Sequence, residues 1–378
     1  MDNESEIEKI IQKKGGRLDY SGLDENLKRG FELVKFRAEG AIEVFATQLV
    51  GINNIFFDII DDYSFNAFAT GINNTYFIGI NRGTIATLSL IFDRMLADNE
   101  IFSYIGNTEL EKKELPLLEN ISTNFEYIVN MVPPFSPPQC PVRRAVSKRM
   151  TELALDFILA HEITHIINGH VAFGAYKLDM AMDEMATFKE EETRKMMINK
   201  TLEMDADALA TTILLTSELN ICLGKAPLPG NEWLDIYKNP GIVLMQFSFV
   251  ISTIFKIFGD QRLNNSTFET DAYPKPRLRL VISMLEIKSN PEFLLINERA
   301  NFDLDENEIP ITIEAGFKII EAAFERITGK KSNTLSIDDA RGQLGFNQIN
   351  KMVDFWNSDL KNTLQKYAHK WVFEKESV

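Results

Sequence analysis

The chain has 378 residues, 45% of them hydrophobic, so it can bury a large core and has the composition of an ordinary globular protein. Forty basic and 55 acidic side chains give a formal charge of -15, which repels nucleic-acid phosphates and anionic membrane surfaces. We therefore expect no nucleic-acid partner. The two cysteines are too few for a disulfide framework, and the charged N-terminus has no apolar run typical of a secretory signal. Both features favour a cytoplasmic location.

In chain order, residues 1–50 are predicted to be helical, because apolar residues recur three and four positions apart in "LKRGFELVKFRAEGAIEVFATQLV". Two β-prone runs follow at 54–62 and 74–83, separated by "YSFNAFATGIN", and helical character returns at 84–96. A small sheet is expected here. The five prolines of "VPPFSPPQCPV", residues 132–142, favour an extended connection that marks a boundary.

The second half of the chain is predicted to be largely helical, with segments at about 143–169, 201–223 and 240–258 and a helical tail after Asn301. Residues 178–200 are polar and rich in methionine. The pair Asn168-Gly169 is typical of a helix end. The charge run "KEEETRK" indicates a solvated helix face or a mobile loop.

Residues 241–259 are the one stretch apolar enough to suggest a membrane helix. Polar residues, among them Gln246 and Lys256, interrupt it before the roughly 20 apolar positions that a membrane span needs. They recur near helical spacing, as in a core helix with one thin polar stripe. We therefore expect a buried helix and no stable membrane insertion.

The stretch "HEITHIINGH", residues 161–170, contains three of the four histidines in the chain. His161 and His165 are four residues apart, so on a helix they lie about 40° apart in projection and can reach one cation. Glu162 lies about 100° from His161 and is suited to be a general base that holds water, as in the H-E-x-x-H zinc hydrolases. On a continuous helix His170 would point about 140° away from His165, so we expect it not to be a ligand.

A buried helix without a metal is the alternative, because "LALDFILAHEITHII" is apolar on nearly every side apart from the motif. Burying two histidines and a glutamate together costs several kcal/mol unless they are compensated, and a bound cation removes that penalty. Burial therefore favours the metal site.

A zinc hydrolase also needs a third protein ligand and one open position. In "LEMDADALATTILL", Glu203 and Asp207 stand four residues apart on one predicted helix, beside small alanines that permit close packing. Glu203 is the predicted third ligand, and Asp207 is predicted to accept the free N–H of a ligand histidine. The alternative for this pair is an ordinary exposed acidic turn, and His369 is too remote to be preferred.

The motifs "HEITH" and "EMDAD" together resemble the gluzincin metallopeptidases related to the HtpX heat-shock protease and the CAAX prenyl proteases. "DAYPKPRLRL", residues 271–280, is similar to a later segment of that family, with Tyr273 where histidine is usual. The resemblance implies that Tyr273 stabilises the oxyanion, since a hydroxyl can donate the necessary hydrogen bond. It also implies that Arg279 orients the substrate or braces the site. Without the resemblance both would be interpreted as turn and surface residues.

"FNAFATGINNTYFIGINRGTIATL", residues 65–88, looks like the segment that borders the cleft in the same family. There it pairs with an extended substrate, and here the strand near Tyr76 to Arg82 is expected to supply the edge. The resemblance implies that five residues contact substrate: Asn66, Ala67, Phe68, Ala69 and Ile78.

The order of motifs also looks like that of the Lit phage-exclusion peptidases, which implies a translation factor as substrate. We therefore predict an α+β protein with a mainly helical zincin-like core, one zinc ion per chain and endopeptidase activity on a protein. The predicted organisation is an N-terminal helical segment over 1–50, a metallopeptidase core over 51–290 and a C-terminal helical lobe over 291–378. A latent or non-catalytic zinc protein and a membrane-associated processing enzyme are the alternatives.

Overall fold

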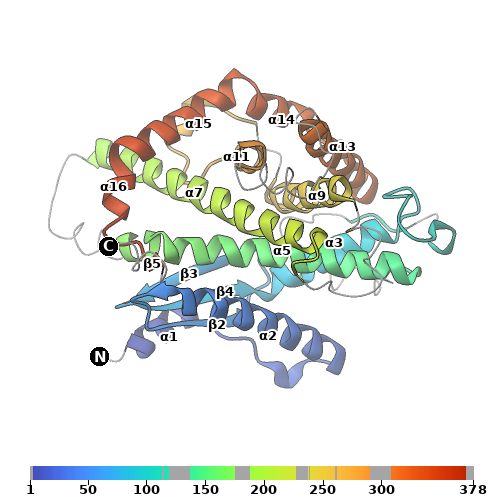
Figure 1. Ribbon diagram of the computed structural model, residues 1–378, viewed down its shortest axis with the longest axis horizontal. Coiled ribbons are helices and arrows are strands. Elements are labelled where there is room, and N and C mark those ends of the chain that lie inside the picture. Colours follow the sequence, from blue (N-terminus) through green and yellow to red (C-terminus); the bar gives the residue numbers. More distant parts are fainter. Residues whose placement is uncertain are drawn as a thin grey trace.

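Helices and two small sheets make up the described part of the chain, in the predicted α+β arrangement of a zincin-like core (Figure 1). This computed structural model describes residues 3–112, 115–118, 137–174, 188–226, 237, 239–259, 262–289 and 308–371.

The larger sheet has the strand order β2-β4-β3. The strands β2 (Asn54–Ile60) and β4 (Thr75–Asn81) are parallel, and β3 (Ala67–Ile72) runs antiparallel to β4. Asn73 and Asn74 form the turn between β3 and β4 with φ of 49° and 61°, a conformation that asparagine tolerates better than most residues. The predictions of β2 and β4 are confirmed. The strand β3 lies in the stretch expected to connect the two β-prone runs, because its alanines and glycine carry little β-sheet signal.

The central position of β4 corrects one prediction. Both neighbours of β4 pair with it along its length, so the stretch from Tyr76 to Arg82 is not an edge that a substrate strand could join. Arg82 already begins the next helix, α3 (Arg82–Leu96). The outer strands are β2 and β3. Residues 16–18 bond to the end of β2, whereas β3 pairs only with β4 among the described strands.

The helix α5 (Pro141–Ile167) crosses the molecule between the sheet and α7, and carries the histidine motif (Figure 1). On the far side of the sheet lies α1 (Asn3–Lys13), which packs on β3 and β4. The helix α2 (Glu25–Gln48) packs on β2 and also contacts α5, where its Arg37 makes ion pairs of 3.1 Å with Glu152 and Asp156. The sheet therefore supports α5 from one side and is itself covered from the other. The predicted helices at the N-terminus and at 143–169 are confirmed, and 132–136 of the proline-rich stretch lie outside the described residues.

The helix α7 (Phe188–Cys222) runs along α5 as one continuous helix. It contains the helix predicted at 201–223 and begins earlier, so the "KEEETRK" run belongs to a helix and not to a loop. Ala206 and Ala210 are fully buried on it. Two helices that also contact α7, α9 (Pro240–Phe258) and α11 (Pro276–Ser289), complete the core. The helix α9 is long and apolar enough to cross a membrane, but most of it is buried in the protein, as predicted for a core helix.

The C-terminal helices form an arch above α7 and α11 (Figure 1). They are α13 (Glu308–Thr328), α14 (Thr334–Arg341), α15 (Gln343–Phe355), the π-helical η4 (Trp356–Leu360) and α16 (Lys361–Leu364). Short helical turns elsewhere are η1 (Tyr20–Gly22), η2 (Thr108–Leu110) and α10 (Asn265–Phe268).

The chain then returns to the sheet side, where β5 (Lys370–Trp371) pairs antiparallel with β1 (Leu49–Val50). The C-terminal segment thus joins the end of α2 to the end of α5. The predicted boundary near residue 290 lies outside the described residues, so the division into three parts stays a prediction.

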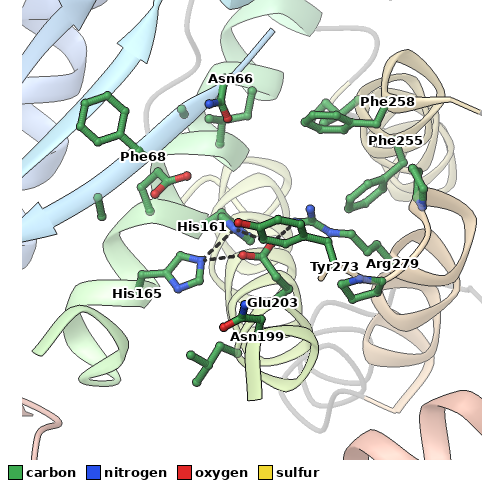
Figure 2. Close-up of a pocket in the computed structure, with 18 of the residues that line it drawn as sticks. Asn66, Phe68, His161, His165, Asn199, Glu203, Phe255, Phe258, Tyr273 and Arg279 are labelled. Atoms are coloured by element: carbon green, nitrogen blue, oxygen red, sulfur yellow. Dashed lines mark hydrogen bonds and ion pairs between the residues drawn. The ribbon is translucent and has the colours of Figure 1, made fainter. Parts of the chain in front are cut away.

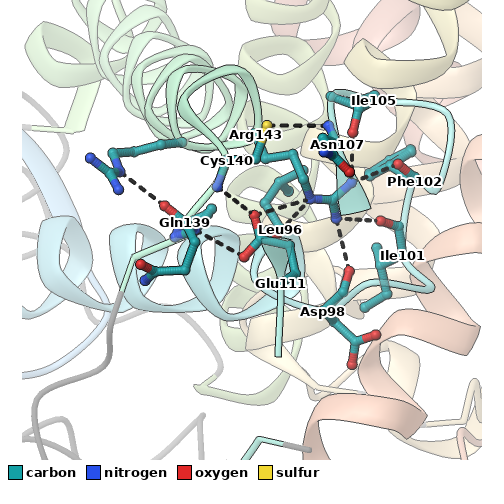
Figure 3. A network of polar contacts seen from close by, with 12 residues as sticks. Leu96, Asp98, Ile101, Phe102, Ile105, Asn107, Glu111, Gln139, Cys140 and Arg143 are labelled. Carbon is teal, nitrogen blue, oxygen red and sulfur yellow. Dashed lines mark hydrogen bonds and ion pairs between the residues drawn. The ribbon is translucent and has the colours of Figure 1, made fainter. Parts of the chain in front are cut away.

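One buried arginine anchors the start of α5 (Figure 3). The Arg143 guanidinium donates hydrogen bonds to five backbone carbonyls, at distances of 2.7 to 2.9 Å. These carbonyls belong to Leu96, Asp98, Ile101, Phe102 and Ile105. The contacts tie the end of α3 and the loop after it to α5, and so set where the motif helix begins.

Candidate metal centre

Two helices bring the predicted ligands together. His161 and His165 lie one turn apart on α5, and Glu203 faces them from α7 (Figure 2). The Nε2 atoms of the two histidines are 3.1 Å apart, and each is 3.5 Å from a Glu203 carboxylate oxygen. All three candidate ligand atoms lie within 4.8 Å of one another. Two imidazole nitrogens and one carboxylate oxygen are a donor set found in catalytic zinc sites, which keep a fourth position open. The side chains present therefore fit a zinc ion.

Asp207 and Arg279 brace this cluster from behind. Oδ1 of Asp207 lies 3.0 Å from Nδ1 of His161, on the ring edge opposite the metal-facing nitrogen. Arg279 donates from Nε and Nη2 to the two Asp207 oxygens, at 2.7 and 2.8 Å. Its Nη2 is also 3.0 Å from Glu203. Of the two implied roles of Arg279, the geometry favours bracing the ligands over contacting substrate.

The titration of the ligands reflects these contacts. Burial alone would lower the pKa of His161, but Asp207 and Glu203 outweigh it and raise that pKa to about 10. Burial, assisted by the neighbouring His161, takes the pKa of His165 well below its usual range. For Glu203 the cationic Arg279 and His161 outweigh burial and lower the pKa. Among the protein groups alone, the anionic Glu203 is thus matched by cations, as a ligand carboxylate must be when it is buried.

Glu162 faces the same space, at the side of the cluster nearest the sheet. Burial raises the pKa of Glu162 to about 7, although His161, Arg279 and the Ala69 backbone act in the opposite direction. A carboxyl group with a pKa near neutrality can both accept and release a proton at ordinary pH. The electrostatics therefore suit the predicted general base.

A cavity of about 930 Å³ opens at the cluster. One wall is the start of β3, including Asn66, Ala67, Phe68 and Ala69, four of the five residues expected to contact substrate. Ile78, the fifth, lies on the central strand with 0% exposure and does not line the cavity, so that prediction is wrong. Its side chain is on the same face as that of its partner Ala69, but on the central strand it is covered by the core that includes α5.

The opposite wall is apolar and comes mainly from α9. Phe255 and Phe258 flank the cavity, and Phe258 meets Phe65 edge to face with ring centroids 5.0 Å apart (Figure 2). This contact joins α9 to the chain just before β3. Tyr273 also lines the cavity, is 60% exposed, and points its ring toward His161 in Figure 2.

His170 is not in the group of candidate ligands among the described residues, as expected, but it contacts the ligand His165. Its Nδ1 lies 2.9 Å from Nδ1 of His165, and its side chain is buried. An angle of about 140° between His165 and His170 applies only if the helix continues. Here α5 ends at Ile167 and the chain turns before His170. The Asn168-Gly169 pair was the signal in the sequence that could have shown this.

Residues 46–220 match the family model described as peptidase family M48. The match indicates a metallopeptidase. It includes the "HEITH" motif and Glu203, ends before Tyr273 and Arg279, and covers less than half of the chain. M48 peptidases are zinc-dependent, in agreement with the donor set found in the cluster. Comparisons with curated proteins and with solved structures gave no match.

Proposed function

We propose that the protein is a zinc-dependent endopeptidase that hydrolyses a protein substrate bound along the edge of β3. The observation that carries the proposal is the convergence of His161, His165 and Glu203 with Glu162 beside them, at a cavity bordered by an edge strand. A metal cluster used only to stabilise the fold would usually close all four ligand positions with protein side chains, and three are found among the described residues.

In this proposal His161, His165 and Glu203 hold zinc, which when bound acidifies a water molecule and polarises the substrate carbonyl. Glu162 accepts the proton from the attacking water and later delivers it to the leaving amine. Its pKa of about 7 suits both steps, because the group is then neither permanently charged nor permanently protonated.

Tyr273 is the proposed hydrogen-bond donor to the oxyanion that develops on the carbonyl. Partial burial and the nearby Glu203 and Glu162 carboxylates raise the pKa of Tyr273, so its hydroxyl keeps the proton that it must donate. Arg279 is proposed to hold Glu203 and Asp207 in place, because both carboxylates already occupy its guanidinium.

An extended polypeptide suits the cavity better than a compact small molecule. Among the described strands β3 pairs only with β4, so its other side has no paired strand and an extended segment can lie along it. The start of this strand is held in place by Thr84 Oγ1, which accepts from the Asn66 N–H and donates to the Asn66 carbonyl, both at 2.8 Å. The phenylalanines on α9 supply an apolar surface for a substrate side chain. The resemblance to the Lit peptidases motivates a finer proposal, a cytoplasmic enzyme of phage defence acting on a translation factor.

The test is hydrolysis by purified, zinc-loaded protein of unfolded casein and of a folded translation factor, with and without a chelator. Glu162→Gln should lower turnover by about 10²–10⁴-fold while zinc stays bound, because it removes only the proton acceptor. Glu39→Gln, at an exposed position on α2, is the matched control and should retain activity. Full activity in Glu162→Gln would exclude the assigned base, and no chelator-sensitive cleavage of any substrate would exclude the endopeptidase.

A further inference from the structure

The chain reverses direction just after the metal-binding helix, and this turn returns His170 to His165. Gly169 adopts φ of 77°, a conformation that favours glycine. A Cβ atom at this position would overlap the Tyr367 and Ala368 backbone, so the C-terminal segment packs directly on the turn. The His369 N–H also donates to the Ile167 carbonyl at 2.8 Å. The turn that places His170 is thus held against the C-terminal segment at both Gly169 and Ile167.

Behind His165 lies a chain of polar contacts that ends on α7. His170 Nδ1 is 2.9 Å from His165 Nδ1, and His170 Nε2 is 3.1 Å from Oδ2 of Asp205. The same Asp205 oxygen accepts a hydrogen bond of 2.6 Å from the Asn168 side-chain amide. His170 retains 2% of its side-chain exposure and Asp205 19%, so water competes little for these contacts.

The positions of the protons follow from the direction in which each ring faces. His165 turns Nε2 toward His161 and Glu203, so a metal ion held there takes that nitrogen and leaves the proton on Nδ1. The Nδ1–H of His165 must then donate to His170, which can accept only if its own Nδ1 carries no proton. His170 therefore has its proton on Nε2, where the carboxylate of Asp205 faces it.

We propose that His170 and Asp205 are positioning residues that hold His165 in its metal-binding orientation and tautomer. This inference rests on the proposed zinc site. His161 is braced directly by Asp207, whereas His165 is braced by Asp205 through the intervening ring of His170. The helix α7 thus supplies one ligand, Glu203, and a carboxylate behind each ligand histidine. Partners of this kind fix the ring orientation and raise the basicity of the ligand.

Nitrogen-15 NMR of histidine-labelled, zinc-loaded protein tests the tautomers directly, since the chain has four histidines. We expect His170 to carry its proton on Nε2, while His161 and His165 carry theirs on Nδ1. The His170 signal is assigned by its loss in His170→Phe, or in His170→Gln if the phenylalanine variant does not fold. A proton on Nδ1 of His170 would overturn the proposal.

Zinc affinity, measured by competition with a chromophoric chelator, provides the second test. His170→Phe fills the same space without an acceptor and should weaken zinc binding about 10–100-fold, as should Asp205→Asn to a smaller extent. His170→Asn should recover part of the loss, because its side-chain oxygen can replace the Nδ1 acceptor. Asp338→Asn, on the exposed face of α14, is the control for charge removal.

Unchanged zinc affinity in folded His170→Phe and Asp205→Asn proteins would overturn the positioning role. Equal losses in His170→Asn and His170→Phe would also overturn it, because a purely structural side chain would show no rescue by an acceptor. If instead the unmodified protein bound no zinc, the proposed function itself would fail. The two failures are therefore distinguishable.

Discussion

Arg143 and Arg279 are both buried arginines, but their partners differ in kind. Arg143 is surrounded by five backbone carbonyls at the start of α5 (Figure 3), whereas Arg279 lies between the Asp207 and Glu203 carboxylates at the metal cluster (Figure 2). Burial lowers the pKa of Arg143, and its acidic neighbours do not make up the difference. Burial also disfavours charge on Arg279, yet Asp207 and Glu203 outweigh it and raise the pKa.

The kind of partner determines what each arginine stabilises. Arg143 holds a loop in one conformation mainly through carbonyl dipoles, and its nearest carboxylate, that of Glu111, is 3.8 Å away. The carboxylates around Arg279 belong to a charged cluster. Their negative charge can be balanced by Arg279 and also by a metal ion bound at the cluster. Replacing each arginine should therefore give losses of different kinds.

The largest effect is expected from Arg143→Met. Five buried carbonyls would lose their donor at once, and each unsatisfied group costs about 1–3 kcal/mol before relaxation, so we expect a loss of about 4 kcal/mol in the free energy of unfolding. Chemical denaturation measures this loss. The control is Arg144→Met, one exposed residue further along α5, which should cost less than about 1 kcal/mol. Equal effects of the two substitutions would contradict the anchoring role.

Arg279→Met should have an intermediate effect that depends on zinc. Without metal the two carboxylates lose their cation, and we expect a loss of about 2 kcal/mol in the free energy of unfolding. Excess zinc should restore more stability to this variant than it adds to the unmodified protein, because the ion supplies the missing positive charge. The measurement is the thermal midpoint with and without zinc. An equal rise of the thermal midpoint of Arg143→Met on adding zinc would contradict the different roles of the two arginines.

The smallest effect is expected at His369, a half-buried group held without charge. Burial lowers the pKa of His369, whose Nε2 lies 2.7 Å from the Tyr76 hydroxyl. As pH falls below the ordinary value of 6.5, the unfolded chain takes up the proton first, so the free energy of unfolding should decrease. His369→Gln should reduce this decrease between pH 7 and 5 in denaturation curves. An unchanged pH dependence would show that the imidazole does not have to remain neutral.

Much of the metal site could be predicted from the sequence because its residues occur in pairs that are four positions apart on a helix. Positions four apart on a helix lie on one face whatever surrounds the helix, so His161 with His165 and Glu203 with Asp207 could be paired in advance. Their convergence also depended on α5 and α7 packing together, for which the small Ala206 was the available hint.

The errors concern features that depend on neighbours distant in the chain. The family resemblance implied that β4, with Ile78, supplies the edge for substrate, but the parallel pairing with β2 makes β4 central. The weakly β-prone stretch at 67–72 becomes the edge strand because β4 supplies its partner. Strand order is a result of tertiary packing, so hydrophobic pattern alone does not reveal it.

Within the motif "HEITHIINGH", some roles follow from the sequence alone, whereas the role of His170 depends on tertiary contacts. Helical periodicity in the sequence was sufficient to assign His161 and His165 to one face of one helix and to place Glu162 about 100° from His161. The role of His170 depended on the turn at Gly169, on the C-terminal segment that packs against that turn, and on Asp205 from another helix. Periodicity applies only while the helix continues, and beyond its end the direction of a side chain is decided by the contacts that the folded chain provides.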